Sequence, residues 1–314
     1  MKVLSTGDLV VDLIVPIREL PLRAEMHQLA NERLFEAGGS CNFLIVASRL
    51  GLATQAVGAV GDDWLGDFVL QQLRDESVGV GHVFVAPNTD TTLSIALVDG
   101  NAEHVFVGAL GHGLDTYQIP INDDKFLGVG AVFCTSYALS NHSFFSPASS
   151  MAILEQAHGQ GIPIFFDLGP AAFAIDRETI SRALTTSNTV LTTQDELLRW
   201  TECANTAEAA AEIRKLGPET LVIKMGSRGC TIVSTDEEIN VEGFEVTPRD
   251  TAGAGDAFAA AFVYGYLKGC SFSEIGAMAN ATGAITVTRL GTGKRLPQRK
   301  EIFDLLQQHG FDLQ

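Results

Sequence analysis

The chain has 314 residues, a formal net charge of −17 and 46% hydrophobic residues. This length and composition allow one large α/β domain or two ordinary ones, each with a sizeable core. The acidic charge disfavours nucleic acids and anionic membrane surfaces as partners, although a local site can still bind an anionic small molecule.

The cysteines and the N-terminus indicate the cellular compartment. The five cysteines lie far apart, without the paired spacing of a zinc site or a disulfide framework, so we expect reduced thiols. The opening sequence MKVLSTGDLVVDLIV lacks the basic region and long apolar run of a signal peptide, and no later segment reaches transmembrane length. These features predict a cytoplasmic protein that binds neither membranes nor nucleic acids.

The first third of the chain alternates apolar strands with helices. A β-rich run at 9–14 follows the first short strand, and residues 43–50 have helical spacing that Gly51 suits as an end. Residues 64–75 form another amphipathic pattern. The strand-like segments that follow are HVFVA, TTLSIALVD and EHVFVGAL, of which the last two alternate and predict a hairpin.

From about residue 113 the pattern becomes strand, helix, strand. The short apolar strands GAVFCTS, IPIFFDLG, NTVLTT and ETLVIKMG are separated by helical segments. Continuous apolar strands of this kind indicate a mostly parallel sheet that helices cover on both faces. The hairpin-rich segments near 13–35 and 87–112 predict a small β-sheet lid on one α/β domain, residues 1–314.

The segment RDTAGAGDAFAAAF, residues 249–262, carries the most informative chemistry. Apolar residues four apart predict a helix that begins near Asp256, where backbone N–H groups are unpaired and the helix dipole is positive. The small residues Gly253, Ala254 and Gly255 let a ligand oxygen approach those N–H groups, which predicts an anion hole. If a phosphoryl group binds there, Asp256 can accept the proton of an attacking hydroxyl.

The longer string DTAGAGDAF resembles the signature of the ribokinase-like (PfkB) carbohydrate kinases. The resemblance runs the length of the chain, through GDLVVDLI, AGGSCNFLIVASRLG, GAVGDDWLGDFVLQQLRDESV, VIKMGSRG and ANATGAITVTRLGTG in the family's order. It implies a ribokinase-like fold with sugar and ATP at the carboxyl edge of the sheet, and ATP and Mg²⁺ as cofactors.

The resemblance also implies roles for individual residues. The sugar-contacting positions are matched by Asp12, Gly38, Gly39 and Asn42. The nucleotide-side positions are matched by Gly226, Ser227, Gly229 and Asn280, and Lys224 beside them is a further candidate for ATP binding. The anion hole and base of the family are matched by Gly253, Ala254, Gly255 and Asp256. The cation-linked positions are Glu196, near Mg²⁺ through water, and Asp250 with Thr251, near a K⁺ site.

Three positions depart from the family pattern. Thr193 stands where the Asn of an Asn-x-x-Glu motif is expected, although Glu196 is retained, so magnesium placement should depend more on water and on Glu196. Asp167 is retained from an Asp-x-Asn-x-Arg motif, but the Asn and Arg are absent from DLGPAAF. Lys224 occupies a strand position that is usually neutral; it either reaches a nucleotide phosphate or is a solvated strand-end lysine, with the second interpretation favoured.

One apparent motif is rejected. The segment GTGKRL, residues 291–296, has the Gly-Lys pair of a phosphate-binding P-loop. It lacks a glycine five residues before Gly293, and Arg295 rather than Ser or Thr follows Lys294. The sequence therefore predicts no P-loop.

The distribution of arginine narrows the substrate. No arginine occurs between Arg74 and Arg177, a span that covers the second lid segment, and Lys125 is its one lysine. Sugar acids and sugar phosphates usually need a forked Arg contact, so a neutral substrate is favoured unless Arg23 or Arg33 of the first lid segment reaches the site.

The predicted function is ATP-dependent phosphorylation of a hydroxyl of a small neutral sugar, as in ribokinases and fructokinases. One alternative is a nucleoside kinase of the same fold, for which Phe106 or His112 could clamp the base. Another is a sugar-binding protein without catalysis, which the intact Asp256 argues against. A homodimer formed through the lid is a further expectation.

Overall fold

The computed structural model describes residues 1–109 and 123–313. Its large sheet is built from β1 (Lys2–Thr6), β4 (Ala53–Gly61), β5 (Gly79–Ala86), β8 (Val129–Thr135), β9 (Ile164–Asp167), β10 (Thr189–Thr193), β11 (Thr220–Lys224), β12 (Cys230–Val233) and β13 (Glu238–Val241). The order in space is β13-β12-β11-β10-β9-β8-β1-β4-β5. All neighbours from β11 to β5 are parallel, and β12 and β13 add an antiparallel edge, as a mostly parallel sheet predicts.

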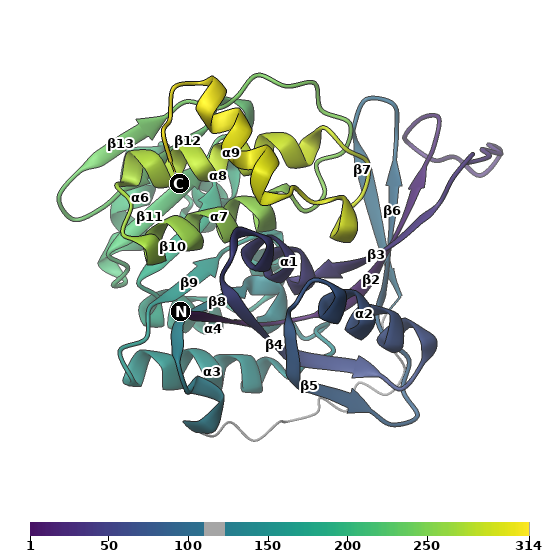
Figure 1. Ribbon diagram of the computed structural model, residues 1–314, viewed down its shortest axis with the longest axis horizontal. Helices are drawn as coiled ribbons and strands as arrows, with labels where there is room; N and C mark the ends of the chain where they lie inside the picture. Colours follow the sequence, from purple (N-terminus) through teal and green to yellow (C-terminus); the bar gives the residue numbers. More distant parts are fainter. Residues whose placement is uncertain (110–122, 314) are drawn as a thin grey trace.

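Helices cover both faces of this sheet (Figure 1). One face packs against α1 (Ser40–Leu50), α2 (Trp64–Asp75), α7 (Ala254–Lys268), α8 (Phe272–Val287) and α9 (Arg299–Gln308). The other packs against α3 (Pro147–Gly159), α4 (Arg177–Thr186), α5 (Gln194–Thr201) and α6 (Thr206–Lys215). The short helix α5 was not predicted from the sequence.

The strand residues alternate between the two hydrophobic layers. Phe165 belongs to the core under α7, whereas its neighbour Phe166 belongs to the core under α4. This follows from the two-residue period of a strand, which sends successive side chains to opposite faces. Phe258 and Phe262 of α7 are also buried, so these phenylalanines are core residues as expected.

The lid is a second sheet, which stands beside the large one in Figure 1. Its strands are β2 (Leu9–Pro16), β3 (Leu34–Gly39), β6 (Leu93–Val98) and β7 (His104–Ala109), in the order β3-β2-β6-β7. β6 and β7 form the expected hairpin. The first lid segment differs from the prediction, because residues 17–33 contain no strand and β2 pairs in parallel with β6. Residues 110–112 of the second segment lie outside the described residues.

Two helices begin at the carboxyl edge of the large sheet. α1 starts directly after β3 and ends at Gly51, whose left-handed φ of 101° gives the predicted helix stop. α7 packs along α1 and starts at the predicted anion hole. Among residues 1–109 and 123–313, no helix has both the length and the apolar composition of a membrane span.

Candidate active site

The first turn of α7 carries the predicted anion hole and base. The helix begins at Ala254, and Gly253 before it has a φ of 72°, in the left-handed region. No side chain of the described residues caps this helix start. The N–H of Ala254 donates to the carbonyl of Thr251 at 3.3 Å, so the N–H groups of Gly255 and Asp256 are the ones available to an anionic ligand. Asp256 lies in the same turn. One short segment therefore combines donors for an oxyanion with a carboxylate acceptor.

The two glycines of this turn differ in what a side chain would meet. At Gly253 the positive φ disfavours other residues, and an added Cβ would lie 3.3 Å from Cγ2 of Thr292. The φ of Gly255 is outside the left-handed region, and an added Cβ would lie 3.5 Å from Nζ of Lys224, an ordinary contact. Gly253 therefore shapes the turn, whereas Gly255 leaves open space beside the Lys224 ammonium.

Asp256 is a partly buried carboxylate whose pKa suits a base at neutral pH. Asn42, in the first turn of α1, donates its side-chain amide to Oδ2 of Asp256 over 3.2 Å. Desolvation raises the pKa of Asp256 to about 7 and the charge of Asp167 adds to the rise, while Asn42 and Lys224 counteract it. A carboxyl group with a pKa near the ambient pH is well matched to general base catalysis.

Asp167 and Lys224 form an ion pair at the carboxyl ends of β9 and β11. Nζ of Lys224 lies 2.6 Å from Oδ2 of Asp167, and the two side chains are only 13% and 8% exposed. The interpretation of Lys224 as a solvated strand-end lysine is therefore wrong. β10 lies between the two strands, so the lysine reaches across it to the carboxylate. The sequence did contain a signal for this contact. Asp167 and Lys224 each end a strand of a parallel sheet, and parallel strands end at the same edge of the sheet.

Thr193 and Glu196 form a capping box at the start of α5. The Thr193 hydroxyl accepts the N–H of Glu196 over 3.2 Å, and Oε2 of Glu196 accepts the N–H of Thr193 over 2.8 Å. Thr193 thus serves the helix start in place of the expected asparagine. The Glu196 carboxylate is held near the ion pair, where its charge helps raise the pKa of Lys224.

Asp12 and Gly38 form one side of the predicted sugar site. Asp12 is 7% exposed, and its Oδ2 accepts the Thr292 hydroxyl over 2.8 Å. A Cβ on Gly38 would lie 2.1 Å from that oxygen, so glycine leaves the space that the carboxylate occupies. Burial raises the pKa of Asp12 to about 6. Gly39, with a φ of 60°, turns the chain from β3 into the helix that carries Asn42.

Residues 291–294 form a loop that joins these groups, and sequence reasoning missed it. Each of the four residues donates one hydrogen bond to a different side chain from another part of the chain. In chain order the acceptors are Oδ2 of Asp250 (2.9 Å), Oδ2 of Asp12 (2.8 Å), Oδ1 of Asn42 (3.3 Å) and Oε2 of Glu36 (3.0 Å). The segment rejected as a P-loop therefore connects the lid strands β2 and β3, α1 and the predicted catalytic loop, residues 249–253 before α7.

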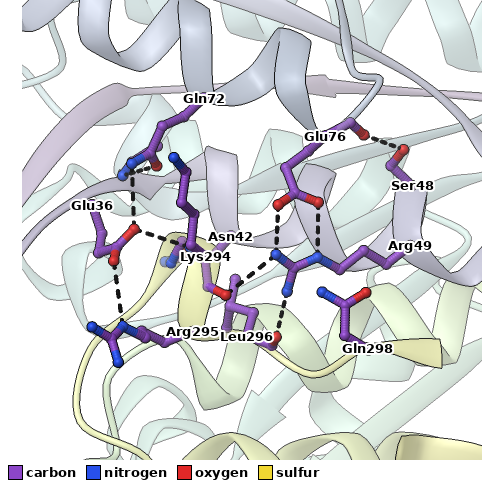
Figure 2. Close-up of polar contacts among 12 residues, drawn as sticks. Glu36, Asn42, Ser48, Arg49, Gln72, Glu76, Lys294, Arg295, Leu296 and Gln298 are labelled. Atoms are coloured by element: carbon purple, nitrogen blue, oxygen red, sulfur yellow. Dashed lines mark hydrogen bonds and ion pairs between the residues drawn. The ribbon is translucent and has the colours of Figure 1, made fainter. Parts of the chain in front are cut away.

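Figure 2 shows the side chains that anchor this loop. Glu36 of β3 also accepts the side-chain amide of Gln72 over 3.3 Å. Arg49 of α1 pairs with Glu76 at 2.6 Å and donates a second hydrogen bond to the carbonyl of Leu296. The loop and the residues after it are thus fixed to α1, α2 and the root of the lid.

The predicted nucleotide-side residues gather around the end of β13. Gly226 and Ser227 lie in the turn after β11, where Ser227 is exposed. Gly229, with a φ of 92°, allows close packing, because an added Cβ would lie 2.0 Å from the Val241 carbonyl oxygen. Asn280 is 7% exposed and donates its amide to the carbonyls of residues 241 and 242, each over 3.0 Å. Asn280 therefore already ties α8 to β13.

The catalytic loop also meets the lid. Asp250 is almost fully buried, and its Oδ1 accepts the N–H of Ala252 over 2.9 Å. Oγ1 of Thr251 lies 3.2 Å from Nδ1 of His104 on β7. A groove of about 520 Å³ lies beside this contact, and its lining residues are Leu20, Pro21, Ala102, Glu103, His104, Val105 and Thr251. Phe106 is half-exposed on β7, whereas His112 lies outside the described residues.

Comparisons with known proteins agree with this geometry. The model of the pfkB family of carbohydrate kinases matches residues 1–299. The chain belongs to the pfkB carbohydrate kinase family. An uncharacterized sugar kinase of Archaeoglobus fulgidus is 29% identical over 252 residues, which is 80% of this chain and 98% of that protein. A nucleoside kinase of Methanothermobacter thermautotrophicus is 24% identical, over 95% of this chain and 93% of its own.

Solved structures share the fold of this kinase. Arabidopsis thaliana ribokinase, in complex with ribose and ATP, superimposes with a TM-score of 0.80 at 23% identity, over 97% of this chain and 98% of that one. An Escherichia coli protein assigned as ribokinase II, in complex with ATP and Mg²⁺, gives a TM-score of 0.83 at 20% identity, over 98% and 99% of the two chains. The predicted ribokinase-like architecture is thereby confirmed.

The structure of this kinase brings some predicted residues together and separates others. Asn42 and Asp256 are in direct contact, and Asp12 joins them through the 291–294 loop. Lys224 points toward the catalytic turn, whereas Asn280 is engaged with the backbone near β13. The candidate site is therefore centred on the first turn of α7, with a lid side and a β13 side around it.

Proposed function

We propose that this kinase transfers the γ-phosphoryl group of ATP to a hydroxyl of a small neutral sugar. The observation that carries the proposal is Asp256, a carboxylate with a pKa raised to about 7 in the uncapped first turn of α7. An acceptor for a hydroxyl proton and donors for a phosphoryl oxygen are thus adjacent. Phosphoryl transfer depends mainly on such positioning and electrostatic stabilisation.

The sugar would bind on the lid side of this centre. Asp12 and Asn42 offer a carboxylate and an amide to sugar hydroxyls, and Gly38 leaves the space in which the Asp12 carboxylate lies. As the hydroxyl oxygen bonds to the γ-phosphorus, its proton passes to Asp256. The N–H groups of Gly255 and Asp256 would hold the charge that moves between the phosphates.

ATP would bind on the other side, along the turn after β11. The residues proposed for this role are Lys224, Gly226, Ser227, Gly229 and Asn280. Gly226 and Ser227 are exposed there, while Gly229 and Asn280 shape the wall at β13. Asn280 would contribute through its placement of β13, since its amide nitrogen already has two acceptors.

The residues present fit a magnesium ion that arrives with ATP. Oδ1 of Asp167 is buried without a hydrogen-bond partner among the described residues, and Glu196 is held nearby. No cluster of three or more metal-ligating side chains occurs in the part of the chain that the structure describes. Glu196, through water, and Asp167 would therefore hold an ion carried by the phosphates, and the ion would neutralise phosphate charge.

Three further expectations belong to this proposal. A potassium ion beside Asp250 and Thr251 would stiffen the catalytic loop, whose Asp250 carboxylate already organises two backbone N–H groups. Two copies of the chain would associate through the lid. The kinase would act in the cytoplasm on small molecules, with no nucleic-acid partner.

The class of sugar follows from the charges of the site. Asp12 repels an anionic substrate, and Arg23 and Arg33 of the lid connection are exposed. Curated relatives range from a Haemophilus influenzae ribokinase to a Bacillus cereus 5-dehydro-2-deoxygluconokinase, so family likeness does not select the class. A nucleoside is the second candidate, because the half-exposed Phe106 on β7 could stack on a base.

ATP consumption measured against a substrate panel tests this proposal. The panel holds neutral sugars, nucleosides, sugar acids and sugar phosphates, and we expect the highest kcat/KM for a neutral sugar. Asp12→Ala should raise the sugar KM and leave the KM for ATP within about twofold, since the ligands bind on different sides of Asp256. A sugar acid as best substrate, with binding abolished by Arg23→Ala or Arg33→Ala, would contradict the neutral class.

A further inference from the structure

Lys224 combines burial, charge and proximity to the catalytic turn. It ends β11 and lies in register with Thr193 of β10, while its ammonium reaches Asp167 at the end of β9. On its other side Nζ faces Gly255, because a Cβ added to that glycine would lie 3.5 Å from it. The ammonium is thus located between the ion-pair partner and the first turn of α7.

The buried Lys224 has a carboxylate as its direct partner. Its Nζ donates a hydrogen bond to Oδ2 of Asp167 at 2.6 Å, and the lysine side chain is only 13% exposed. A buried ammonium is tolerated where a carboxylate compensates its charge in this way. Lys224 thus brings a positive charge to a cluster with the carboxylates of Asp167, Glu196 and Asp256.

Without the Lys224 ammonium, this cluster of carboxylates would repel the negatively charged triphosphate of ATP. Asp167, Glu196 and Asp256 all act electrostatically on the same small region. The chain also lacks the Arg that would follow Asp167 and the Asn that would stand at Thr193. A transferring phosphoryl group spreads negative charge over its oxygens, so it needs a cation beside the N–H donors.

We infer that Lys224 is a catalytic residue that contacts the γ-phosphoryl group during transfer, with Asp167 as the positioning residue that holds its ammonium. The inference rests on the proposed kinase function. The hydroxyl oxygen bonds to the γ-phosphorus and gives its proton to Asp256, the bond from the γ-phosphorus to the bridging oxygen breaks, and ADP leaves with that electron pair. Lys224 keeps its proton throughout and stabilises the transferred oxygens.

A specific consequence is discrimination between nucleotides. A lysine beside Gly255 serves the terminal phosphate, so it should matter for a triphosphate and little for ADP. Because Nζ is a compact charge on a flexible chain, it can shift from Asp167 toward the phosphate without a change in the backbone. If the ion pair of Lys224 with Asp167 were purely structural, loss of the lysine would affect the binding of the triphosphate and of ADP equally.

Calorimetric binding of adenylyl-imidodiphosphate and of ADP, each with Mg²⁺ and without sugar, tests the inference. Lys224→Met should weaken binding of the triphosphate analogue by roughly tenfold and change ADP binding by less than about threefold. With sugar and ATP, the kcat of Lys224→Met should fall by about 100-fold or more. Lys215→Met, which removes an exposed lysine from α6, is the control and should match the wild type.

A second variant separates catalysis from folding. Lys224→Met leaves the Asp167 carboxylate buried and unpaired, which by itself can destabilise the protein. The double variant Lys224→Met with Asp167→Asn removes both charges and should recover thermal stability. Its turnover should stay low, because it lacks both the lysine and a carboxylate that would hold the magnesium ion. Recovery of turnover in the double variant, or an equal loss of both nucleotides in Lys224→Met, would overturn the inference.

The same measurements separate this inference from the proposed function. If the wild type binds neither nucleotide, the proposed kinase function fails and the inference falls with it. If the wild type binds both nucleotides but phosphorylates no substrate of the panel, the choice of sugar is wrong. The nucleotide preference of Lys224→Met then still supports or overturns the role of the lysine.

Discussion

At the scale of single residues, the site is an arrangement of carboxylates with different partners. Asp256 accepts a hydrogen bond from Asn42, and Asp12 accepts one from the hydroxyl of Thr292. Asp167 forms an ion pair with Lys224. Desolvation raises the pKa of both Asp12 and Asp256, to about 6 and about 7. The base therefore titrates near neutrality because of its surroundings, which no property of an isolated aspartate would give.

The first prediction concerns the protonation of Asp256. A carboxyl group with a pKa of about 7 is protonated at lower pH, so kcat should rise with pH through about 7 and level off above it. Asp256→Asn should lower kcat by roughly 100-fold or more and remove this rise, in steady-state kinetics from pH 5.5 to about 9. Turnover equal to that of the wild type would remove Asp256 from the mechanism.

The same variant has an opposite effect on stability. Since folding raises this pKa, the folded state binds the proton more tightly, and stability falls as the pH rises from 3.8 through about 7. Asp256→Asn removes that cost. We therefore expect its Tm to exceed that of the wild type by roughly 2 °C or more at pH 8, with a smaller gain at low pH. An equal gain at both pH values would point to altered packing instead.

At the scale of elements, the 291–294 loop connects parts of the chain that share no secondary structure. Its residues donate hydrogen bonds to Glu36 of β3, Asp12 of β2, Asn42 of α1 and Asp250 of the catalytic loop. The contacts with Asp12, Asn42 and Asp250 orient groups that the proposed mechanism uses, and the contact with Glu36 anchors the loop itself. Displacement of this loop would therefore disturb the sugar side and the base together.

The second prediction tests this connection through Glu36. Glu36→Ala leaves the N–H of Lys294 and the amide of Gln72 without their acceptor, at a cost of about 1–3 kcal/mol of unfolding free energy in urea denaturation. The sugar KM should rise severalfold, because Asp12 and Asn42 are held by the same loop. Glu36→Gln keeps an acceptor oxygen and is the matched control. If Glu36→Ala behaves as the wild type, the loop does not depend on this contact.

At the scale of the whole molecule, the lid is attached firmly at its root and exposed at its outer edge. Its root is fixed by the 291–294 loop and by α2, whereas β7 forms an edge of the lid sheet. Val105, Phe106 and Val107 on this strand are 43%, 50% and 52% exposed. Apolar residues on an open sheet edge favour association with another chain.

The third prediction is that two copies of the chain associate through this edge. Light scattering coupled to size exclusion should give the mass of a dimer for the wild type, and Phe106→Glu should give a monomer because it places a charge in the apolar edge. Leu127→Glu changes an exposed leucine away from the lid and should stay dimeric. A wild type that is monomeric at micromolar concentration would contradict the lid interface.

The sequence by itself determined the parallel sheet and most of its helices, and it predicted where the main site lies. Short apolar strands between amphipathic helices gave the parallel sheet, because strand and helix periodicities are local properties of the chain. The glycine and alanine residues before an apolar helix predicted the helix start of α7, and with it the proposed anion hole and base, since a helix start follows from a few consecutive residues. The prediction of a hairpin-rich first lid segment was wrong in part, because residues 17–33 contain no strand.

Only the tertiary structure decided which side chains meet. Lys224 and Asp167 are 57 residues apart, Asn42 and Asp256 are 214 apart, and Thr292 and Asp12 are 280 apart. These contacts depend on the order of β9, β10 and β11 and on the packing of α7 against α1, which no local pattern contains. A lysine at a strand end therefore looked solvated in the sequence. The fold buries it, because the neighbouring strands bring a carboxylate and a helix N-terminus to the same edge.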